Sequence, residues 1–402
     1  MKILLVIQTM DSRSGGPCAG IQNFVPELKK LNVTHEVVCT DDVSSKFVPV
    51  SPFTIHKLGG RNRLGYYNKN LIPWLQENIC NYDLVVVHAL WGYHGYAVNK
   101  VLKQLKRKKD CKCPGYLVMP HGMLDPYFQQ AKHRKLKALR NIIYWNLIEQ
   151  KVINQSEGLL FTCLEEQHLA KDTFKGYSPK REMNIGYGIY PPPPDTILSR
   201  EIFYKKVITW RERKPYFLFL GRIDIKKGLE ILIDAYLELL TSSGIAIETI
   251  PDIVISGPGY DTPYGRNLKH KIDSDKLLAN KVQFTGMLTG DAKWGAFYGC
   301  EAFVLASHQE NFGISVGEAL ACKKPVLISN KVNIYKEIQN SNAGLVEEDN
   351  VNGAYNLLYK WLKLTKEEQE KMCENAMTCY KENFHIHHTA ELLKGVYEEL
   401  LA

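Results

Sequence analysis

Short runs of apolar residues alternate with longer stretches in which apolar residues recur at helical spacing, and this pattern continues along the whole chain. Such an alternation of strands and helices is typical of a parallel α/β fold. In the first half, the apolar runs predict strands at residues 2–7, 35–40, 83–88, 115–119 and 158–162. In the second half, they predict strands at residues 217–221, 252–257, 282–286, 302–307, 325–329 and 343–347. The pattern therefore predicts an α/β fold with two doubly wound sheets.

The two sheets are expected to form separate domains. Four consecutive prolines at residues 191–194 cannot continue a helix and favour an extended linker, so we place the boundary near residue 195. A chain of 402 residues also exceeds the roughly 250 to 300 residues at which a single core stops growing. Ligands of open α/β sheets bind at the carboxyl ends of the strands, so we expect the site in loops at a cleft between the two domains.

The composition is that of an ordinary globular protein, with 45% hydrophobic and 23% charged residues and no low-complexity tract. The opening residues MKILLVIQTM hold an apolar run that is shorter than a signal-peptide core. Elsewhere no apolar run approaches the roughly 18 residues of a membrane span. We therefore expect a cytoplasmic protein that does not cross a membrane.

Ten cysteines are scattered along the chain. The one tight pair, Cys111 and Cys113, has no second Cys or His cluster at zinc spacing, so structural zinc is not expected. Four others lie in or beside apolar segments and are expected to be small buried thiols, as in a reducing compartment: Cys39, Cys163, Cys300 and Cys322.

The net charge of +8 is distributed unevenly. Residues 1–195 carry 26 Lys and Arg against 16 Asp and Glu, or +10, whereas the remainder carries 25 against 27, or −2. Much of the excess lies in residues 101–112 and 131–151, and the second segment mixes basic and apolar residues at near-helical spacing. Two interpretations stay open, namely solvated helix faces, or a surface for an anionic partner such as a membrane leaflet or a diphosphate-bearing acceptor. Nucleic acid is not expected, because the lysines are not interleaved with stacking aromatic residues.

Two loops that follow predicted strands resemble phosphate cradles. Gly15 and Gly16 stand at the start of a predicted helix, where glycine lets backbone amides approach a phosphate closely, although a plain turn needs the same residues. In the second loop, Arg222 follows a strand, and Lys227 precedes a glycine at a helix start. Two cations beside a helix N-terminus suit a diphosphate and could stabilise its charge as it leaves. The alternative for the second loop is a surface cluster of ion pairs.

Two further loops hold candidate ligand contacts. The glycines that follow residues 252–257 lack the spacing of a dinucleotide fingerprint, so Gly257 is interpreted only as a close backbone turn that faces a nucleotide. After the strand at 302–307, Glu310 lies in a loop and Glu318 lies on the predicted helix 314–322. A carboxylate can accept hydrogen bonds from two hydroxyls at once, so the pair suits a ligand with two polyol ends joined by phosphates. Local pairing of Glu318 and simple exposure of Glu310 are the alternative.

These motifs carry a resemblance. Glu310 and Glu318, with NFGISVG between them and EALACKKPVLIS following, resemble the E-x7-E motif of retaining glycosyltransferases of family 4, which have the GT-B fold. GRIDIKKG resembles the diphosphate-binding segment of that family, VQFTG its base-contacting loop, and SGG at 14–16 its N-terminal phosphate loop. MPHGMLDPY resembles a segment of bacterial members that build surface polysaccharides. The resemblance covers nearly the whole chain.

The resemblance implies a role for each matching residue. Arg222 and Lys227 would bind the donor diphosphate, Glu318 the ribose hydroxyls, and the backbone around Met287 the base. Glu310 would contact the donor sugar near the reacting carbon. Sugar and phosphate would also meet the backbone amides of Asn311, Phe312, Gly313 and Ile314.

The first domain would contribute to the same site. His121 would face the sugar across the cleft, and it completes a catalytic set with Glu310, Arg222 and Lys227. The family's terminal helix crosses back, which implies domains at 1–195 and 196–380 and a returning helix at 381–402. The chain departs from the family at Tyr187, where members often have Asn.

The residues and the resemblance together predict a retaining glycosyltransferase that moves a sugar from a UDP- or GDP-linked donor to a glycan or lipid-linked acceptor. The leaving diphosphate would help to deprotonate the acceptor hydroxyl, so no enzyme nucleophile is needed. Asp273 and Asp275 lie in a helical pattern rather than at a strand end, so no metal or other cofactor is expected. We expect peripheral contact with the inner face of an anionic membrane. A sugar-nucleotide epimerase and a non-catalytic nucleotide-sugar binding module stay open as alternatives.

Overall fold

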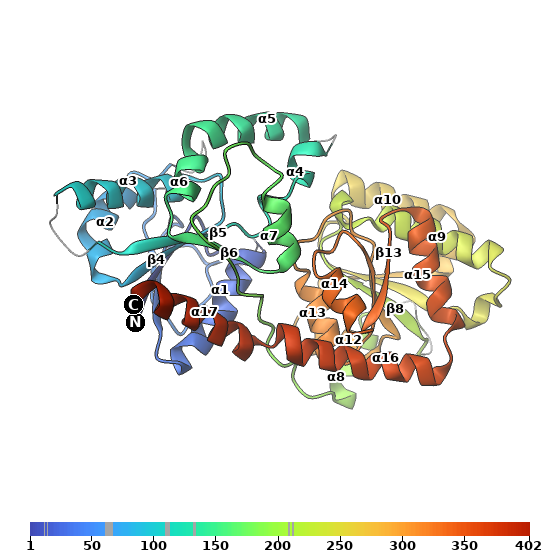
Figure 1. Ribbon diagram of the computed structural model, residues 1–402. Helices are drawn as coiled ribbons and strands as arrows, with labels where there is room; N and C mark the ends of the chain where they lie inside the picture. Colours follow the sequence, from blue (N-terminus) through green and yellow to red (C-terminus); the bar gives the residue numbers. More distant parts are fainter. Residues whose placement is uncertain are drawn as a thin grey trace. The chain divides into compact units, whose positions relative to one another are not determined.

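The computed structural model describes residues 1–11, 13, 15–60, 67–108, 113–131, 134–207, 210 and 213–402, and its chain forms two compact units (Figure 1). Unit 1 comprises Met1–Gly188 and Ile386–Ala402, and unit 2 comprises Ile189–His385. The boundaries predicted at residues 195 and 381 thus differ by a few residues from those of the structure. The reason lies at the edge of unit 2, where the Ile189 amide donates to the Phe384 carbonyl at 2.8 Å and ties both crossing segments into that unit.

Unit 1 is built on a parallel sheet of seven strands in the order β3-β2-β1-β4-β5-β6-β7. Its strands are β1 Lys2–Ile7, β2 Thr34–Cys39, β3 Ile55–Lys57, β4 Leu84–His88, β5 Gly115–Met119, β6 Gly158–Phe161 and β7 Glu182–Asn184. Its helices are α1 Gly16–Lys30, α2 Leu71–Asn78, η2 Ile79–Asn81, α3 Tyr93–Lys108, α4 Tyr127–Gln130, α5 Lys135–Tyr144, η4 Trp145–Glu149, α6 Gln150–Asn154, α7 Leu164–Ala170 and α17 Ile386–Leu401. Helix α17 packs on α1, where His387 contacts Glu27 at 3.3 Å.

Unit 2 is built on a parallel sheet of six strands in the order β10-β9-β8-β11-β12-β13, and helices cover both of its faces (Figure 1). Its strands are β8 Tyr216–Leu220, β9 Asp252–Ser256, β10 Val282–Gly286, β11 Ala302–Leu305, β12 Val326–Ser329 and β13 Gly344–Glu347. The larger helices are α8 Ile197–Tyr204, α9 Leu229–Ser242, α10 Pro263–Ser274, α11 Lys276–Lys281, α12 Gly290–Gly299, α13 Ile314–Ala321, α14 Tyr335–Asn340, α15 Val351–Lys363 and α16 Lys366–Cys379. Shorter turns of helix are η5 Ile225–Lys227, η6 Ile247–Thr249 and η7 Tyr380–Phe384.

The predicted α/β fold with two doubly wound sheets is confirmed. Central strands such as β4 and β9 are buried along their whole length, which is why the sequence marks them as continuous apolar runs. Two short edge strands, β3 and β7, were not predicted, because their sequences IHK and EMN contain no apolar run and their residues are only partly buried or exposed. Among the described residues, no helix is long and apolar enough to span a membrane.

The four cysteines expected to be small thiols are buried thiols. Cys80 is disulfide-bonded, so the expectation of free thiols does not extend to every cysteine. Cys111, which is close to Cys113 in the sequence, lies outside the described residues.

One buried acid in unit 1 makes a testable prediction. Glu149 ends the π-helical turn η4, is 1% exposed, and accepts a hydrogen bond from the Trp91 amide at 3.2 Å. Burial raises the pKa of Glu149 to about 8, and the Trp91 hydrogen bond lowers it only in part. The carboxyl is therefore protonated in the folded state at neutral pH and ionised in the unfolded chain.

A raised carboxyl pKa contributes stability that is present at low pH and is lost as the pH rises through about 8. Between about pH 6 and about pH 9, wild-type unit 1 should lose on the order of 2–3 kcal/mol that Glu149→Gln retains, because each unit below the folded pKa corresponds to about 1.4 kcal/mol. Urea unfolding followed by tryptophan fluorescence measures this difference. Equal losses in both proteins would contradict the prediction.

Candidate functional site

The strand order of unit 2 reverses between β8 and β11, which are paired through Ala302 with Phe217 and Phe303 with Leu218. Strand β9 pairs with one side of β8, whereas β11 pairs with the other side. Loops that leave the carboxyl ends of such neighbouring strands diverge and leave room for a ligand. The predicted loops after β8 and after β11 are these two loops.

Backbone contacts hold the two loops together. The His308 amide donates to the Lys226 carbonyl at 2.8 Å, and Ser307 Oγ donates to the same carbonyl at 2.9 Å. At Gly228, which follows η5 with a φ of 62°, a Cβ would lie 1.9 Å from the Ala306 carbonyl oxygen. Only glycine allows this approach. The cations of η5 are thereby brought against the loop that carries Glu310.

An ion pair between Lys227 and Glu310 joins the two loops at this point. Their side chains are 14% and 16% exposed, so both charges are largely shielded from water. Burial by itself would raise the pKa of Glu310, but the cations Lys227, Lys226 and Arg222 outweigh it and lower the pKa to about 2. Glu310 is therefore ionised at any physiological pH, and it can accept hydrogen bonds but cannot donate a proton.

The other two cations of the predicted diphosphate loop are placed differently. Lys226 donates to Gln309 Oε1 at 2.9 Å, and burial lowers its pKa. Arg222 is exposed, and its guanidinium forms no ion pair with any residue that the structure describes. Arg222 is thus a fixed charge beside Glu310 that is available to an anionic ligand.

The predicted helix after Glu310 is α13. Gly313 caps it in the left-handed region with a φ of 76°, and Glu318 on the helix pairs with Lys293 of α12 at 2.5 Å. Burial raises the pKa of Glu318, and Lys293 offsets this only in part. Phe312 is buried in edge contact with Phe384, with ring centroids 5.3 Å apart. Its side chain therefore belongs to the core, and its backbone is the part that a ligand could meet.

Asn311 and Ile314, the other two residues predicted to present amides, are both half-buried. They flank Phe312 and Gly313, so the segment 311–314 forms one continuous stretch from the loop into the helix N-terminus. Helix α13 is two turns long, and its N-terminus favours negative charge.

Gly257 lies in the loop after β9 and packs directly on the Arg222 loop. Its φ is 141°, and a Cβ there would lie 1.8 Å from the Gly221 carbonyl oxygen. Its amide donates to the Gly286 carbonyl at 2.8 Å, which joins it to the end of β10. Met287 follows directly and is 70% exposed. The structure therefore places the predicted unit 2 residues on α13 and on the loops at the carboxyl ends of the strands.

The predicted unit 1 residues lie at the carboxyl ends of its own strands. Gly15 has a φ of 90° and caps α1, which begins at Gly16, and no other atom of the described residues lies within 4 Å of a Cβ built at either position. Two neighbours in this loop, Ser12 and Ser14, lie outside the described residues. The open space is compatible with the predicted close backbone approach and with a plain turn.

His121 follows β5 in the left-handed region with a φ of 54°. Its Nε2 lies 2.9 Å from Nδ1 of His88, the last residue of β4, and the two rings are stacked. Burial lowers the pKa of His121 to about 3, so the ring is neutral at physiological pH. His88 was not predicted, because the sequence alone does not show that β4 and β5 are neighbours.

The sequence also missed a polar network behind the Glu310 loop. His308 contacts Glu230 at 3.0 Å and Asp349 at 3.1 Å, and Tyr264 donates to Glu230. These carboxylates raise the pKa of His308, with Glu230 the largest contribution. His308 could have been found from its place two residues before Glu310, whereas Lys293 lies on another helix and leaves no local signal.

The structure places the two acids of the predicted D-x-D sequence in other interactions. Asp273 pairs with Lys269 at 2.6 Å, and Asp275 caps α11 by accepting from the Leu277 and Leu278 amides. No cluster of three or more His, Cys, Asp or Glu in the described part of the chain is placed to hold a metal ion. Metal independence stays a prediction.

Comparison with known proteins finds a family match within unit 2. Residues 201–378 match the model of the family glycosyl transferases group 1. An uncharacterized glycosyltransferase of Methanocaldococcus jannaschii is 30% identical over 155 residues, which are 38% of this chain and 37% of the relative. O-antigen chain mannosyltransferase C of Escherichia coli is 28% identical over 203 residues, which are 49% of this chain and 50% of the relative. The chain thus matches half or less of the length of these curated relatives.

Solved structures match the whole chain at low identity. A glycosyltransferase from Rickettsia africae has a TM-score of 0.75 at 19% identity, over 100% of this chain and 98% of that chain. Anabaena HepE in complex with UDP-glucose has a TM-score of 0.71 at 15% identity, over 99% of this chain and 100% of that chain. The chain therefore has the GT-B fold that its motifs predicted, and its residues 201–378 match the family glycosyl transferases group 1.

Proposed function

We propose that this protein is a retaining glycosyltransferase that moves a sugar from a UDP- or GDP-linked donor to a hydroxyl of a glycan or lipid-linked acceptor in the biosynthesis of a polysaccharide or glycoconjugate. The carrying observation is the Lys227–Glu310 ion pair across the β8/β11 switch point, beside the exposed Arg222. Support for a nucleotide sugar comes from HepE, which was solved with UDP and with UDP-glucose. Support for the pathway comes from the O-antigen mannosyltransferase relative.

The two cations have distinct tasks in this proposal. Arg222 is exposed and can form a bidentate contact with a phosphate, whereas Lys227 is a compact charge held between Glu310 and the incoming diphosphate. Charge builds up on the diphosphate as the bond to the sugar breaks, and both cations stabilise it there. The α13 N-terminus adds a favourable dipole through the segment 311–314.

The ionised state of Glu310 defines its role. With a pKa of about 2 it accepts hydrogen bonds from sugar hydroxyls and orients the ring, and it does not act as a proton donor. The acid and base pair of a glycoside hydrolase needs one protonated carboxyl, which Glu310 does not supply. The leaving diphosphate takes the proton of the attacking acceptor hydroxyl on the same face of the sugar, which retains the configuration of the reacting carbon.

The remaining donor contacts follow from the same loops. Lys293 engages Oε1 of Glu318, and we assign the ribose hydroxyls to Oε2. Gly257 and Met287 lie at the neighbouring strand ends, so we assign the base to them. Contact of Gly15, Gly16 and His121 with the donor stays a prediction from the resemblance.

A thermal-shift panel tests the donor site. UDP, GDP, ADP and their common sugars are added without metal to the wild type and to Arg222→Ala, and one nucleotide class should stabilise the wild type. Arg222→Ala should weaken that nucleotide by about tenfold or more, since a charge-assisted bidentate contact is lost. Arg213→Ala is the matched control, because Arg213 is also an exposed arginine of unit 2 but precedes β8, at the opposite edge of the sheet.

The panel has clear contrary outcomes. No shift with any nucleotide, or an equal loss in both arginine variants, would reject the assignment of the donor diphosphate to Arg222. A shift that requires a divalent metal would reject metal independence and keep the donor site.

A further inference from the structure

Helix α5 and the following turn η4 carry a row of exposed apolar side chains on unit 1. Leu136, Leu139, Ile143 and Leu147 are 85%, 56%, 53% and 67% exposed. Their spacing of three or four residues places them on one face of the helix. We call these four residues the apolar row. Isolated exposed leucines are ordinary, but a contiguous row marks an interaction surface.

The apolar row points away from the core of unit 1. The same helix buries Ala138, Asn141, Trp145 and Glu149, which recur at the same spacing two residues out of step with the row. At about 100° per residue, the centres of the two sets lie on opposite sides of the helix. Packing against the core of unit 1 therefore covers one face of α5 and η4 and leaves the apolar row exposed.

Unpaired cations surround the row. Within α5 these are Lys135, Lys137 and Arg140, and all three are exposed. No acidic residue occurs in residues 93–108 or 135–148. None of the cations of these segments forms an ion pair with any residue in the described ranges. This surface therefore carries positive charge only, whereas a solvated helix normally mixes both signs.

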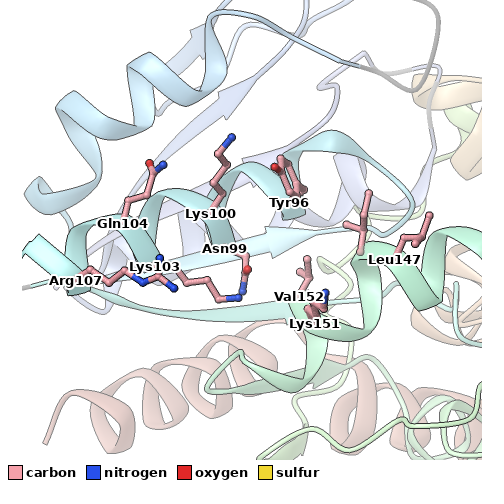
Figure 2. Close-up of a pocket in the computed structure, with 10 residues that line it drawn as sticks. Tyr96, Asn99, Lys100, Lys103, Gln104, Arg107, Leu147, Lys151 and Val152 are labelled. Carbon is pink, nitrogen blue, oxygen red and sulfur yellow. The ribbon is translucent and has the colours of Figure 1, made fainter.

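A basic pocket of about 290 Å³ adjoins the row between α3 and the η4–α6 segment (Figure 2). Lys100, Lys103 and Arg107 line it from α3, and Lys151 lines it from α6. Leu147 belongs both to the apolar row and to the pocket wall. Hydrogen bonds make the floor of the pocket rigid. Asn99 donates to Tyr116 Oη at 2.8 Å, and Tyr116 donates to the Val152 carbonyl at 2.6 Å.

We propose that this face of unit 1 docks on an anionic lipid bilayer, with the apolar row inserted among the acyl chains and a lipid headgroup phosphate held in the basic pocket. An in-plane helix with apolar residues outward and cations along its flanks suits a planar anionic surface. A second copy of this chain fits less well, since a two-fold contact through this face would bring its unpaired cations together. An acidic protein partner would neutralise the cations, but it would not explain a pocket whose size fits a small anionic group.

The docking surface lies on unit 1, and the proposal of it does not depend on the donor site in unit 2. Membrane docking also favours a lipid-linked acceptor, and this one consequence rests on the proposed function. Vesicle binding without nucleotide tests the surface, and nucleotide binding without vesicles tests the donor site. Failure of one therefore leaves the other standing.

The test measures sedimentation of the full chain with vesicles of phosphatidylcholine alone and of phosphatidylcholine with phosphatidylglycerol. The wild type should bind only the anionic vesicles, and added salt should weaken this binding because exposed charges are screened. Leu136→Ser with Leu139→Ser should weaken binding by about tenfold or more, through loss of apolar insertion. A second variant neutralises pocket cations and should weaken binding as much: Lys103→Gln, Arg107→Gln and Lys151→Gln.

Matched controls come from unit 2. Ile197→Ser with Leu198→Ser removes two equally exposed apolar residues of α8, and the charge control is Lys205→Gln, Lys206→Gln and Lys214→Gln. Both controls should bind like the wild type. Circular dichroism and nucleotide binding establish that each variant is folded.

Several results would overturn the proposal. These are absence of wild-type binding to anionic vesicles, unchanged binding by both unit 1 variants, or equal losses in the unit 2 controls. A concentration-dependent dimer in light scattering that disappears in the Leu136/Leu139 variant, without vesicle binding by the wild type, would assign the face to a second copy instead.

Discussion

Replacement of Glu310 by glutamine should lower the rate of sugar transfer by about 100-fold or more, with nucleotide affinity kept within a few-fold. Glutamine has nearly the same shape but lacks the negative charge that pairs with Lys227 and accepts hydrogen bonds from the sugar. The loss falls on the reacting sugar, because the nucleotide is held by Arg222 and the neighbouring loops. Release of nucleotide diphosphate from the donor found in the thermal-shift panel measures the rate.

The same variant distinguishes an enzyme from a binding module. A module that only binds nucleotide sugars would keep all of its measurable function in Glu310→Gln. Glu301→Gln is the matched control, because Glu301 is exposed and directly precedes β11, at the other end of the strand that leads to Glu310. Turnover by Glu310→Gln at the wild-type rate would remove Glu310 from the catalytic set.

Replacement of Gly257 by alanine should abolish nucleotide binding and destabilise unit 2 by about 3 kcal/mol or more. The new Cβ would collide with the Gly221 carbonyl oxygen, a backbone atom that cannot move without displacing the Arg222 loop. The φ of 141° adds strain that alanine does not tolerate. Chemical unfolding and nucleotide titration measure the two effects.

Gly244→Ala separates the collision from the general effect of positive φ. Gly244 also lies in unit 2 and has a φ of 71°, but within the described ranges no other atom lies within 4 Å of a Cβ built there. We expect it to cost about 1 kcal/mol and to leave nucleotide binding unchanged. Equal effects of the two substitutions would mean that the contact between the loops after β8 and β9 does not position the donor site.

The sequence predicted the fold well because buried parallel strands leave a strong local signal. Strands β8 and β11 are continuous apolar runs, and a proline tract marks the linker region. Strand β7 escaped prediction, since three half-buried or exposed residues at a sheet edge need no apolar run. The unit boundary also differed, because hydrogen bonding of Ile189 with the distant Phe384 sets it rather than the composition of the linker.

Candidate residues were predictable where chemistry is concentrated in one loop. Glu310, Arg222 and Lys227 each lie in a short segment with glycine and a helix start, and such a pattern is visible without coordinates. Lys293 and His88 were not predictable in this way. Each acts through a partner on a neighbouring element, and that neighbourhood arises only on folding.

The sequence by itself determined the two-sheet α/β architecture, the loops that carry the polar residues, and the excess of cations in residues 101–112 and 131–151, because these depend on local periodicity and composition. The tertiary structure alone decided that Lys227 and Glu310, which lie 83 residues apart, share one ion pair, since the strand order brings β8 beside β11. It also decided that the apolar row of α5 and η4 faces away from the core. The buried face includes the polar Asn141 and Glu149, so composition does not single it out, and the packing of Trp145 and Glu149 selects it.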